Sequence, residues 1–252
     1  MKRNLKLVLT LEAFLGLAAT GATAADLAVK ARPIVAPVTP WTACYIGGNV
    51  GGGWTRVDTS RAATDLVNPA FANYGRETDN GFVGGVQVGC DFQTTNLVFG
   101  VEGMFDFSSI KGQHALTDFP TFSETNNLKS LASTTGRIGY LFTPTFLGYG
   151  KGGIGWMQNK NSVFLPGGGL LESANYWLPG MTAGGGVEWM FAPNWSVFVE
   201  YNYYWIEDTS GQHLNAAPGL VGETLNVKQT AQTATVGVNY RFNWGGPVVA
   251  KY

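Results

Sequence analysis

The sequence predicts an all-β protein, an eight-stranded antiparallel transmembrane β-barrel of the outer-membrane type with short periplasmic turns and long extracellular loops. Three observations predict this fold. Alternation of apolar and polar residues with period 2 recurs eight times, which is the pattern of half-buried strands. The gaps between these stretches alternate between three or four residues and twenty or more, as in outer-membrane barrels. The 252 residues include 35 glycines and 13% aromatic residues but only 13% charged ones, about half the charge of a soluble domain.

The chain is predicted to begin with an export signal. Residues 1–24 fit a signal peptide, with a basic start, an apolar centre and an A-x-A cleavage site at 22–24. Residues 25–40 are rich in Pro and Ala and are predicted to form a periplasmic linker. The barrel follows over 41–242, and 243–252 are predicted to be a short C-terminal tail. After the signal peptide, no apolar run approaches the roughly 18 residues that a membrane-spanning helix needs.

The eight predicted strands take up most of the barrel region. They are 42–55, 81–91, 96–108, 129–142, 146–158, 181–191, 195–206 and 229–242. The gaps at 92–95, 143–145 and 192–194 carry the Pro or polar residues that tight turns need. The longer gaps are rich in Asn, Thr, Ser, Gly and Asp and are predicted to be extracellular loops, at 56–80, 109–128, 159–180 and 207–228.

The two faces of each predicted strand differ in polarity. In the seventh strand, Val197 and Val199 share one face, while Ser196, Glu200 and Asn202 share the other. The apolar face is predicted to contact lipid and the polar face to line the lumen. Aromatic residues cluster near the strand ends, as interfacial girdles should. The predicted girdles are Trp41, Phe92, Phe142, Phe146, Phe191, Trp195 and Phe242 at the short-turn end, and Trp54, Phe82, Phe107, Trp156 and Trp205 at the long-loop end.

Five ionisable side chains are predicted to form one charged layer across the lumen. Two acid–base pairs lie on neighbouring strands, Glu102 with Arg137 and Lys151 with Glu188, and Glu200 lies at a similar depth. The layer is either an electrostatic plug or a charged constriction that admits ions. The lumen of eight strands is just wide enough for side chains to fill, which favours the plug.

Cys44 and Cys90 are the only cysteines, and an even count in an exported protein favours a disulfide. Cys44 lies early in the first predicted strand and Cys90 late in the second, so both lie near the periplasmic end and on the apolar face. A disulfide is predicted if the register of the two strands brings them together; otherwise they are free thiols.

Four segments together resemble a known family. They are AADLAVKARP (24–33), WTACYIGGNVGGGW (41–54), GGVQVGCDFQ (84–93) and YRFNWGGPVVAKY (240–252). They are similar to the alphaproteobacterial outer-membrane immunogenic protein family, small porin-like surface antigens with an opacity-protein-like or OmpA-like barrel. The resemblance covers the whole chain and implies eight strands, periplasmic termini and exposed, antigenic loops. Some members are credited with porin activity and others with haem binding, and no family ligand residue is carried over.

The last predicted strand ends in VGVNYRF (236–242), which resembles the signal read by the barrel-assembly machinery. Gly237, Tyr240 and Phe242 carry this assembly signal, with both aromatic side chains on the lipid face. The assembly machinery is therefore a predicted partner, together with outer-membrane lipid and lipopolysaccharide.

No catalytic, cofactor or metal site is predicted. Asp208, Ser210 and His213 are residue types of a catalytic triad, but a loop without a rigid element does not fix their geometry. His114 and His213, with two cysteines outside a CxxC pair, give no metal motif. The segment GGNVGGGW (47–54) lacks the Lys-Ser/Thr ending of a phosphate-binding loop. A net charge of −1 leaves no basic stripe for nucleic acid.

These patterns predict a non-enzymatic outer-membrane protein, a structural and antigenic component of the cell envelope with a largely plugged lumen. The alternative is a narrow porin for ions or very small solutes. A surface receptor that binds haem or a host ligand through its loops, with His114 and His213 as candidates, is a further alternative. A barrel enzyme is disfavoured by the missing catalytic set.

Overall fold

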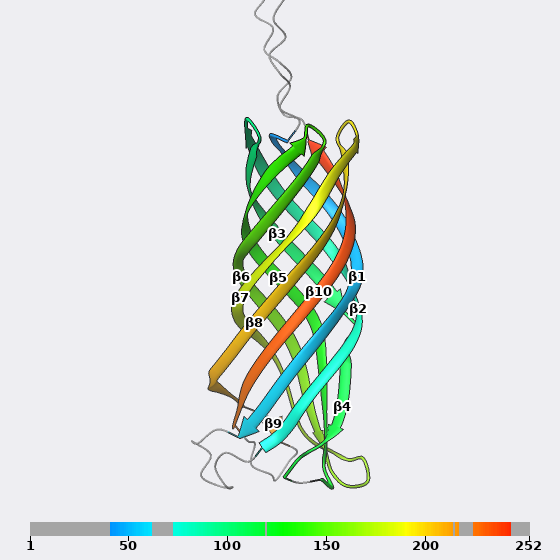
Figure 1. Ribbon diagram of the computed structural model, residues 1–252. Helices are drawn as coiled ribbons and strands as arrows, with labels where there is room; N and C mark the ends of the chain where they lie inside the picture. The colour runs from blue at the N-terminus through cyan, green and yellow to red at the C-terminus, as the bar shows by residue number, and fades with distance from the viewer. Residues whose placement is uncertain (1–40, 62–72, 119, 214, 217–223, 243–252) are drawn as a thin grey trace, which may run out of the picture. The chain divides into compact units, whose positions relative to one another are not determined.

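The protein is an antiparallel β-barrel in a computed structural model that describes residues 41–61, 73–118, 120–213, 215–216 and 224–242 (Figure 1). The predicted signal peptide, linker and C-terminal tail lie outside these residues. The strands are β1 (Ala43–Arg61), β2 (Asn73–Thr94), β3 (Leu97–Ser108), β4 (Lys111–Ala115), β5 (Ser123–Thr143), β6 (Phe146–Phe164), β7 (Leu170–Ala192), β8 (Trp195–His213), β9 (Asn215–Ala216) and β10 (Thr224–Phe242). Among the described residues, no helix is long and apolar enough to span a membrane.

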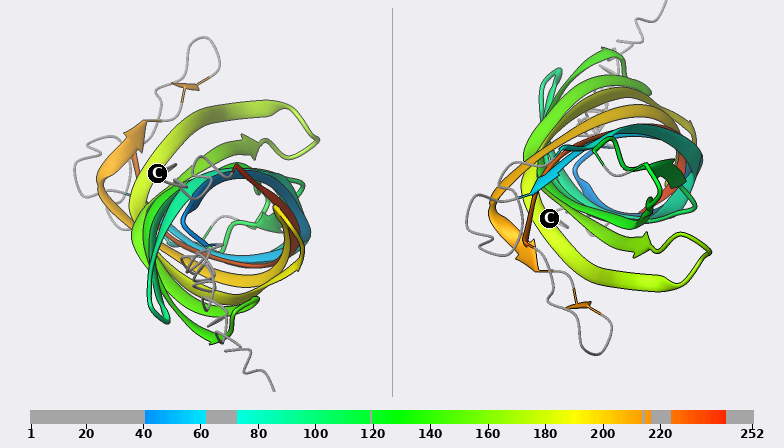
Figure 2. Two further views of the ribbon diagram at one scale, coloured as in Figure 1. Left: turned by 90° about the horizontal axis from the view of Figure 1, so that it is seen from above. Right: turned by 90° about the horizontal axis from the view of Figure 1, so that it is seen from below.

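The sheet closes on itself through its first and last strands. The ladder between β1 and β10 runs from Cys44 opposite Phe242 to Arg61 opposite Leu225. Going round the ring, β5 pairs first with β3 and then, beyond residues 109–110, with β4, so β4 continues the wall where β3 ends. β9 is a two-residue strand beside β7. The wall therefore has eight members, as predicted, and the two end-on views show the closed ring (Figure 2).

The three short turns lie where the sequence predicts them. They are Thr95-Asn96, Pro144-Thr145 and Pro193-Asn194, at the upper end in Figure 1. Thr95 and Asn194 have positive φ angles of 52° and 70°, a conformation that tight hairpins require and that Asn tolerates better than most residues. These turns mark the end that faces the periplasm in outer-membrane barrels.

The four predicted long loops are largely wrong, because most of their residues extend the strands. β2 begins at Asn73 rather than at 81, β5 at Ser123 rather than at 129, and β7 at Leu170 rather than at 181. The Asn, Thr, Ser and Asp residues of these segments look like loop residues in a pattern search. They are strand residues here on both faces of the wall, because Thr78 and Asn80 are exposed on the outside whereas Asn159 and Asn161 are buried inside the barrel.

The barrel consists of two sections with opposite side-chain patterns. We call the part between the two aromatic girdles the membrane section. Its outward side chains are apolar and exposed, with Phe82 at 77%, Phe142 at 66% and Val199 at 57%. An exposed apolar surface of this kind is what a barrel presents to lipid. Trp177, near the end of the predicted loop 159–180, lies just beyond the outer girdle and is 44% exposed.

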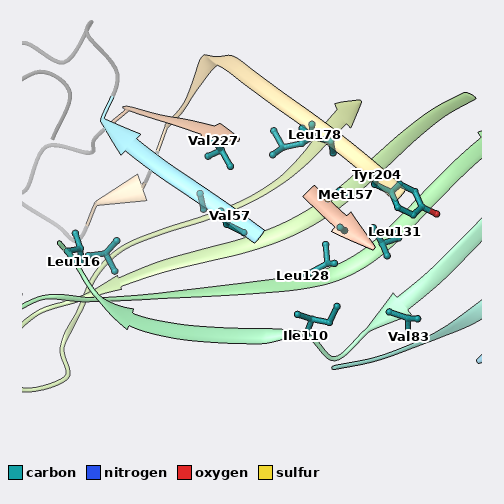
Figure 3. Packing of buried hydrophobic residues seen from close by; sticks show 14 residues of the cluster. Val57, Val83, Ile110, Leu116, Leu128, Leu131, Met157, Leu178, Tyr204 and Val227 are labelled. Atoms are coloured by element: carbon teal, nitrogen blue, oxygen red, sulfur yellow. The ribbon is translucent and has the colours of Figure 1, made fainter. Parts of the chain in front are cut away.

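We call the part beyond the outer girdle the outer section. It comprises 55–61, 73–81, 111–115, 123–129, 157–164, 170–178, 206–213 and 224–231, at the lower end in Figure 1. Many of its inward side chains form an apolar core in the lumen (Figure 3), and buried polar side chains such as Glu77, Glu124 and Asn159 lie inside the same section. The core contains Val57, Val83, Ile110, Leu116, Leu128, Leu131, Met157, Val163, Ala174, Leu178, Tyr204, Ile206, Val227 and Ala231, some at the boundary with the membrane section.

Trp41 was predicted to belong to the inner girdle, and this prediction is wrong. Its ring is fully buried inside the lumen, and its indole Nε1 donates a hydrogen bond to the carbonyl oxygen of Pro144 at 3.0 Å. It packs with a second apolar cluster at the short-turn end, formed by Val98, Leu141, Leu147, Tyr149 and Met190. The guanidinium of Arg241 lies 4.4 Å from the centre of its ring, which makes the lumen the more favourable place for this aromatic group.

Candidate functional site

Two arginines inside the membrane section share the same pair of carboxylates. Arg137 on β5 binds Asp91 on β2 through Nε at 2.7 Å and through Nη2, and its Nη1 lies 3.2 Å from Glu188 Oε2 on β7. Arg241 on β10 donates to Asp91 Oδ2 at 2.8 Å and to Glu188 Oε1 at 2.7 Å. Four strands are thus joined across the lumen by charge-assisted hydrogen bonds, which are stronger than neutral ones.

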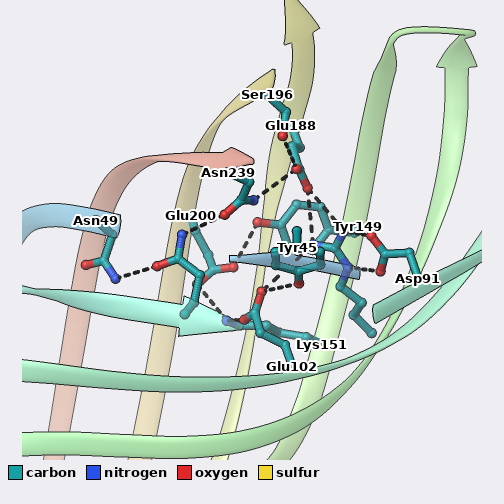
Figure 4. Close-up of polar contacts among 12 residues, drawn as sticks. Tyr45, Asn49, Asp91, Glu102, Tyr149, Lys151, Glu188, Ser196, Glu200 and Asn239 are labelled. Atoms are coloured by element: carbon teal, nitrogen blue, oxygen red, sulfur yellow. Dashed lines mark hydrogen bonds and ion pairs between the residues drawn. The ribbon is translucent and has the colours of Figure 1, made fainter. Parts of the chain in front are cut away.

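A second cluster lies beside the first. Lys151 on β6 places its Nζ 2.7 Å from Glu102 Oε1 and 2.6 Å from Glu200 Oε1, on β3 and β8 (Figure 4). The hydroxyl of Tyr45 donates to Glu102 at 2.7 Å, and that of Tyr149 donates to Glu200 at 2.8 Å. Each carboxylate therefore has both oxygens bound, as a charge taken out of water requires.

Aromatic rings contact the two arginines of the first cluster. The guanidinium carbon of Arg137 lies 5.0 Å from the ring centre of Tyr45 and 4.9 Å from that of Tyr149. Arg241 lies 5.0 Å from the ring of Tyr45. Arg137 Nη1 is also 3.9 Å from Glu102 Oε2, which links the clusters into one network. We call Asp91, Glu102, Arg137, Lys151, Glu188, Glu200 and Arg241, with the rings of Tyr45 and Tyr149, the lumen network.

Small inward residues leave room for these large side chains. Gly89 on β2 lies against the ring of Tyr45, and Gly100 on β3 lies against the carboxylate of Asp91. A Cβ atom at either position would overlap the neighbouring side chain. The glycine pattern of the strands is therefore a condition for packing bulky ionic groups in a narrow barrel.

Amides extend the network toward the outer section. Asn49 donates to Asp106 at 2.9 Å and to Gln87 at 3.1 Å, and Gln87 donates to Asn239 at 2.8 Å. Asn239 in turn donates to Glu188 at 3.0 Å. These hydrogen bonds link β1, β2, β3, β7 and β10, and the side chains that form them are buried. Among the described residues, no group of three His, Cys, Asp or Glu side chains is arranged to hold a metal ion.

Comparisons with known proteins agree with this architecture. Residues 13–242 match the family model of the outer membrane protein beta-barrel domain. The chain belongs to this family. It is 30% identical over 236 residues to the 31 kDa outer-membrane immunogenic protein of Brucella melitensis, covering 89% of this chain and 95% of that protein. It is also 30% identical over 246 residues to the 25 kDa outer-membrane immunogenic protein of Brucella abortus, covering 95% of this chain and 100% of that protein.

The predicted resemblance to the outer-membrane immunogenic proteins is confirmed by these relatives, and the protein is located in the outer membrane. Among solved structures, Neisserial surface protein A is similar with 15% sequence identity and a TM-score of 0.40, over 79% of this chain and 97% of that chain.

The structure brings the five predicted lumen residues of this outer-membrane protein into one network, but it changes their partners. Lys151 contacts Glu102 and Glu200, and the expected pair with Glu188 is wrong. In the β6–β7 ladder, Glu188 is opposite Leu147 while Lys151 is opposite Gly184, so four residues separate them along the strand. At about 3.3 Å per residue that is beyond the reach of an ion pair.

Four members of the lumen network were missing from the predicted layer. Arg241 lies one residue and Asp91 three residues from the end of its strand, close to the short turns. The alternation in β10 already placed Arg241 on the inward face. Tyr45 shares the inward parity of Asn49 but carries no charge, and the ring of Tyr149 is likewise buried in the lumen. The signal that identifies all four is strand parity, because each shares the inward face with the polar residues of its strand.

Cys44 and Cys90 are joined by a disulfide. They are directly opposite each other in the β1–β2 ladder. On the last strand, Tyr240 and Phe242 point outward, with their ring centres 5.1 Å apart, and Tyr240 also meets Trp195 at 5.0 Å. Gly237 faces inward, where the ring of Phe198 occupies the place of a side chain. Their part in recognition by the assembly machinery stays a prediction.

His114 lies in the outer section and not in a loop, contrary to the sequence prediction. Its Nδ1 is 3.4 Å from Glu77 Oε2 on β2, and its Nε2 is 3.7 Å from Glu124 Oε2 on β5. The hydrogen bond to Glu77 and the attraction of Glu124 raise the pKa of His114, against the opposite effect of burial. No ladder joins β4 to β2, so this contact supports the wall where β3 has ended. The side chains of Asp208, Ser210 and His213 lie outside the described residues.

Proposed function

We propose that the protein is a non-enzymatic structural component of the outer membrane that presents its outer section at the cell surface and whose lumen does not conduct. The observation that carries this proposal is the lumen network. Its three cations and four carboxylates are buried and bonded to one another across the full width of the barrel.

Opening a pore through this network would leave charges without partners. Arg137 and Arg241 each bind two carboxylates on different strands, so moving one side chain uncouples several ion pairs. Removing one partner of a buried pair costs about 3–5 kcal/mol. An ion crossing the barrel would meet this cost at the network in addition to its own desolvation.

Two apolar barriers lie in series with the network. Trp41 and its cluster close the periplasmic end of the lumen, and the apolar core lies in the outer section. An apolar constriction is unfavourable for ions because it offers no polar groups to replace their hydration. Three stacked barriers, two apolar and one ionic, favour a plug over the narrow porin considered from the sequence.

The inaccessibility of the lumen side chains to a substrate supports the non-enzymatic part of the proposal. The four carboxylates of the lumen network and the hydroxyls of Tyr45 and Tyr149 are each bonded to neighbours in the barrel. The side-chain exposure of Arg137, Arg241, Asp91 and Glu188 is 0–1%. A catalytic group must come within hydrogen-bond distance of its substrate. The relatives are named as immunogenic proteins, which supports surface presentation of this chain as well.

Single-channel recording in planar bilayers tests the plug. We expect the folded, heat-modifiable protein to give no stable conductance steps under a range of voltages and salt concentrations. A double variant, Arg137→Ala with Arg241→Ala, removes both shared cations and should give flickering conductance if it folds. Steady wild-type openings of porin size would overturn the proposal in favour of the porin. The variant Arg76→Ala, which changes an exposed arginine, is the matched control and should stay silent.

A further inference from the structure

The basic residues of the barrel are distributed unevenly between its two sections. Every outward-pointing Lys or Arg side chain that the structure describes lies in the outer section, just beyond the outer girdle. They are Arg56, Arg76, Lys111, Lys129, Lys160 and Lys228, and all are exposed. The remaining described cations, Arg137, Lys151 and Arg241, are inside the lumen. We call the six outward residues the basic belt.

Acidic residues of the outer section are sorted in the opposite way. Glu77, Glu124 and Glu172 point into the barrel and are buried. Among the described side chains of its strands, Asp58 is the outward acid, and it is bound by Arg76 at 2.6 Å. The belt therefore presents a net positive surface around the barrel, which attracts anions.

We propose that the basic belt binds the phosphate groups of a phosphorylated glycolipid in the outer leaflet. The position of the belt supports this partner. Arg56 follows Trp54 of the outer girdle by two residues along β1, or about 7 Å. Girdle aromatics mark the boundary between hydrocarbon and headgroups. Anionic headgroups lying at this boundary attract nearby Lys and Arg side chains.

The positions of the outward Lys and Arg residues favour a lipid of the outer leaflet as the ligand. Near the inner girdle, the outward residues of the strand ends include Phe92, Phe142 and Phe242 but no described Lys or Arg. A general affinity for anionic phospholipid would favour cations at both ends of the membrane section. The one-sided belt matches a leaflet whose lipids carry more phosphate than those of the opposite leaflet.

The belt contains one formed pocket on its β1–β10–β8 side. A surface pocket of about 210 Å³ is lined by two cations and one acid, Arg56, Lys228 and Asp58, together with Trp205, Ile206, Gln229 and Thr230. Arg56 is opposite Thr230, and Lys228 is two residues further along β10, so the two cations are diagonal neighbours on adjacent strands. Diagonal neighbours lie roughly 7–8 Å apart, within reach of two long side chains that converge on one phosphate.

The chemistry of the pocket fits a sugar phosphate with acyl chains below it. The guanidinium of Arg56 can bind two phosphate oxygens at once, while Lys228 contributes a point charge. Trp205 is opposite Thr230 and belongs to the outer girdle, so its ring lies where the sugar meets the hydrocarbon. Asp58 is opposite Lys228, but its carboxylate is bound by Arg76, which limits its competition with a phosphate.

Binding to defined lipids tests the proposal on the full-length, refolded protein. The probes are vesicles of phosphatidylcholine that contain bisphosphorylated lipid A, dephosphorylated lipid A or phosphatidylglycerol, with a chelator present so that divalent cations do not bridge charges. We expect binding of bisphosphorylated lipid A to be about 25-fold tighter than binding of the dephosphorylated form, and to weaken with salt. Equal binding of both forms would overturn the proposal.

Two variants locate the site. Arg56→Gln with Lys228→Gln should lose most of the preference for phosphate, since each cation near the surface contributes about fivefold. Lys160→Gln, in the belt but away from the pocket, should lose less than half as much on a logarithmic scale. An unchanged preference in the double variant would overturn the pocket assignment. Vesicles with phosphatidylglycerol that bind as tightly as those with lipid A would overturn the choice of glycolipid.

Discussion

The membrane section and the outer section are built from the same continuous strands, yet they are inside-out relative to each other. In the membrane section the wall is apolar outside and ionic inside, with Val199 outward and Glu200 inward on β8. In the outer section the wall is basic and polar outside and holds an apolar core inside, with Lys228 outward and Val227 inward on β10. The comparison shows that the medium around the wall, lipid or water, determines whether the outward or the inward side chains of a strand are apolar.

The two sections are also stabilised by different forces. The outer section buries an apolar core away from water, as a soluble domain does. The membrane section gains nothing from moving apolar groups from lipid to its lumen, so its interior is free to hold hydrogen-bonded ion pairs, and these fix the positions of facing strands. The following experiments separate the two forces, from the largest expected effect to the smallest.

The largest effect is expected from breaking the lumen network. Glu188→Ala removes the acceptor shared by Arg137 and Arg241 and leaves both cations short of a partner. We expect a loss of about 3–5 kcal/mol in the free energy of unfolding. Urea titration of the barrel in lipid vesicles measures it. Asp58→Ala, which removes an exposed acid, is the matched control and should cost at most about 1 kcal/mol. Similar losses in both variants would mean that the network does not stabilise the membrane section.

A cavity in the apolar core should weaken the outer section and leave the membrane section intact. Leu178 is 1% exposed and belongs to this core. We expect Leu178→Ala to destabilise the outer section by about 2–5 kcal/mol. Hydrogen exchange should speed up for amides of 157–164 and 170–178, with amides near Arg137 unchanged. Val199→Ala, on the lipid face, is the control. A uniform increase in exchange would show that the two sections unfold as one unit.

Loss of the disulfide should act on the membrane section alone. Cys44 and Cys90 join β1 to β2 across a separation of 46 residues. Closing a loop of this size restricts the unfolded chain and contributes about 2–4 kcal/mol. We expect Cys44→Ala with Cys90→Ala to lower the urea midpoint, and reductant to lower that of the wild type equally. Alkylation of either cysteine without prior reduction would contradict the bond itself.

The division between the sections also explains what the sequence could predict. The barrel, its strand number, its short turns and both girdles apart from Trp41 follow from one pattern, apolar outside and polar inside. That pattern ends at Trp54 on β1, and residues beyond it, such as Arg56 and Val57, alternate with the opposite parity. A search for one pattern therefore predicts loops where the strands continue.

Side-chain partners in the lumen are harder to predict than the residues themselves. Strand parity places Glu102, Arg137 and Glu200 inside the barrel without any structure. The choice between Glu188 and Glu200 as the partner of Lys151 depends on strand register and tilt, which set depth across the lumen. Neither is fixed by local sequence in a closed barrel. Strand parity therefore predicts which residues line the lumen, whereas strand register determines which of them form ion pairs.

The smallest expected effect is a dependence of the outer section on pH. Burial and the neighbouring Glu77 raise the pKa of Asp79 to about 6 from its usual 3.8, while burial raises the pKa of Glu124. The hydrogen bond to Glu77 raises the pKa of His114 above its usual 6.5. All three groups bind protons more tightly in the folded protein than in the unfolded chain. The contribution of His114 is therefore complete below its unfolded pKa and disappears as pH rises through its folded pKa.

We expect the outer section to become less stable as pH rises, first between 3.8 and about 6 through Asp79 and then above 6.5 through His114. The second step should amount to at most about 1 kcal/mol, because His114 is partly exposed and its ion pairs are screened. His114→Gln should remove this step and keep the first. The measurement is proteolysis of the β4 region across this pH range, with Leu178→Ala as a variant that weakens the same section at every pH. A wild-type section that becomes more stable with rising pH would show that repulsion among the carboxylates does not govern the contact between β2 and β4.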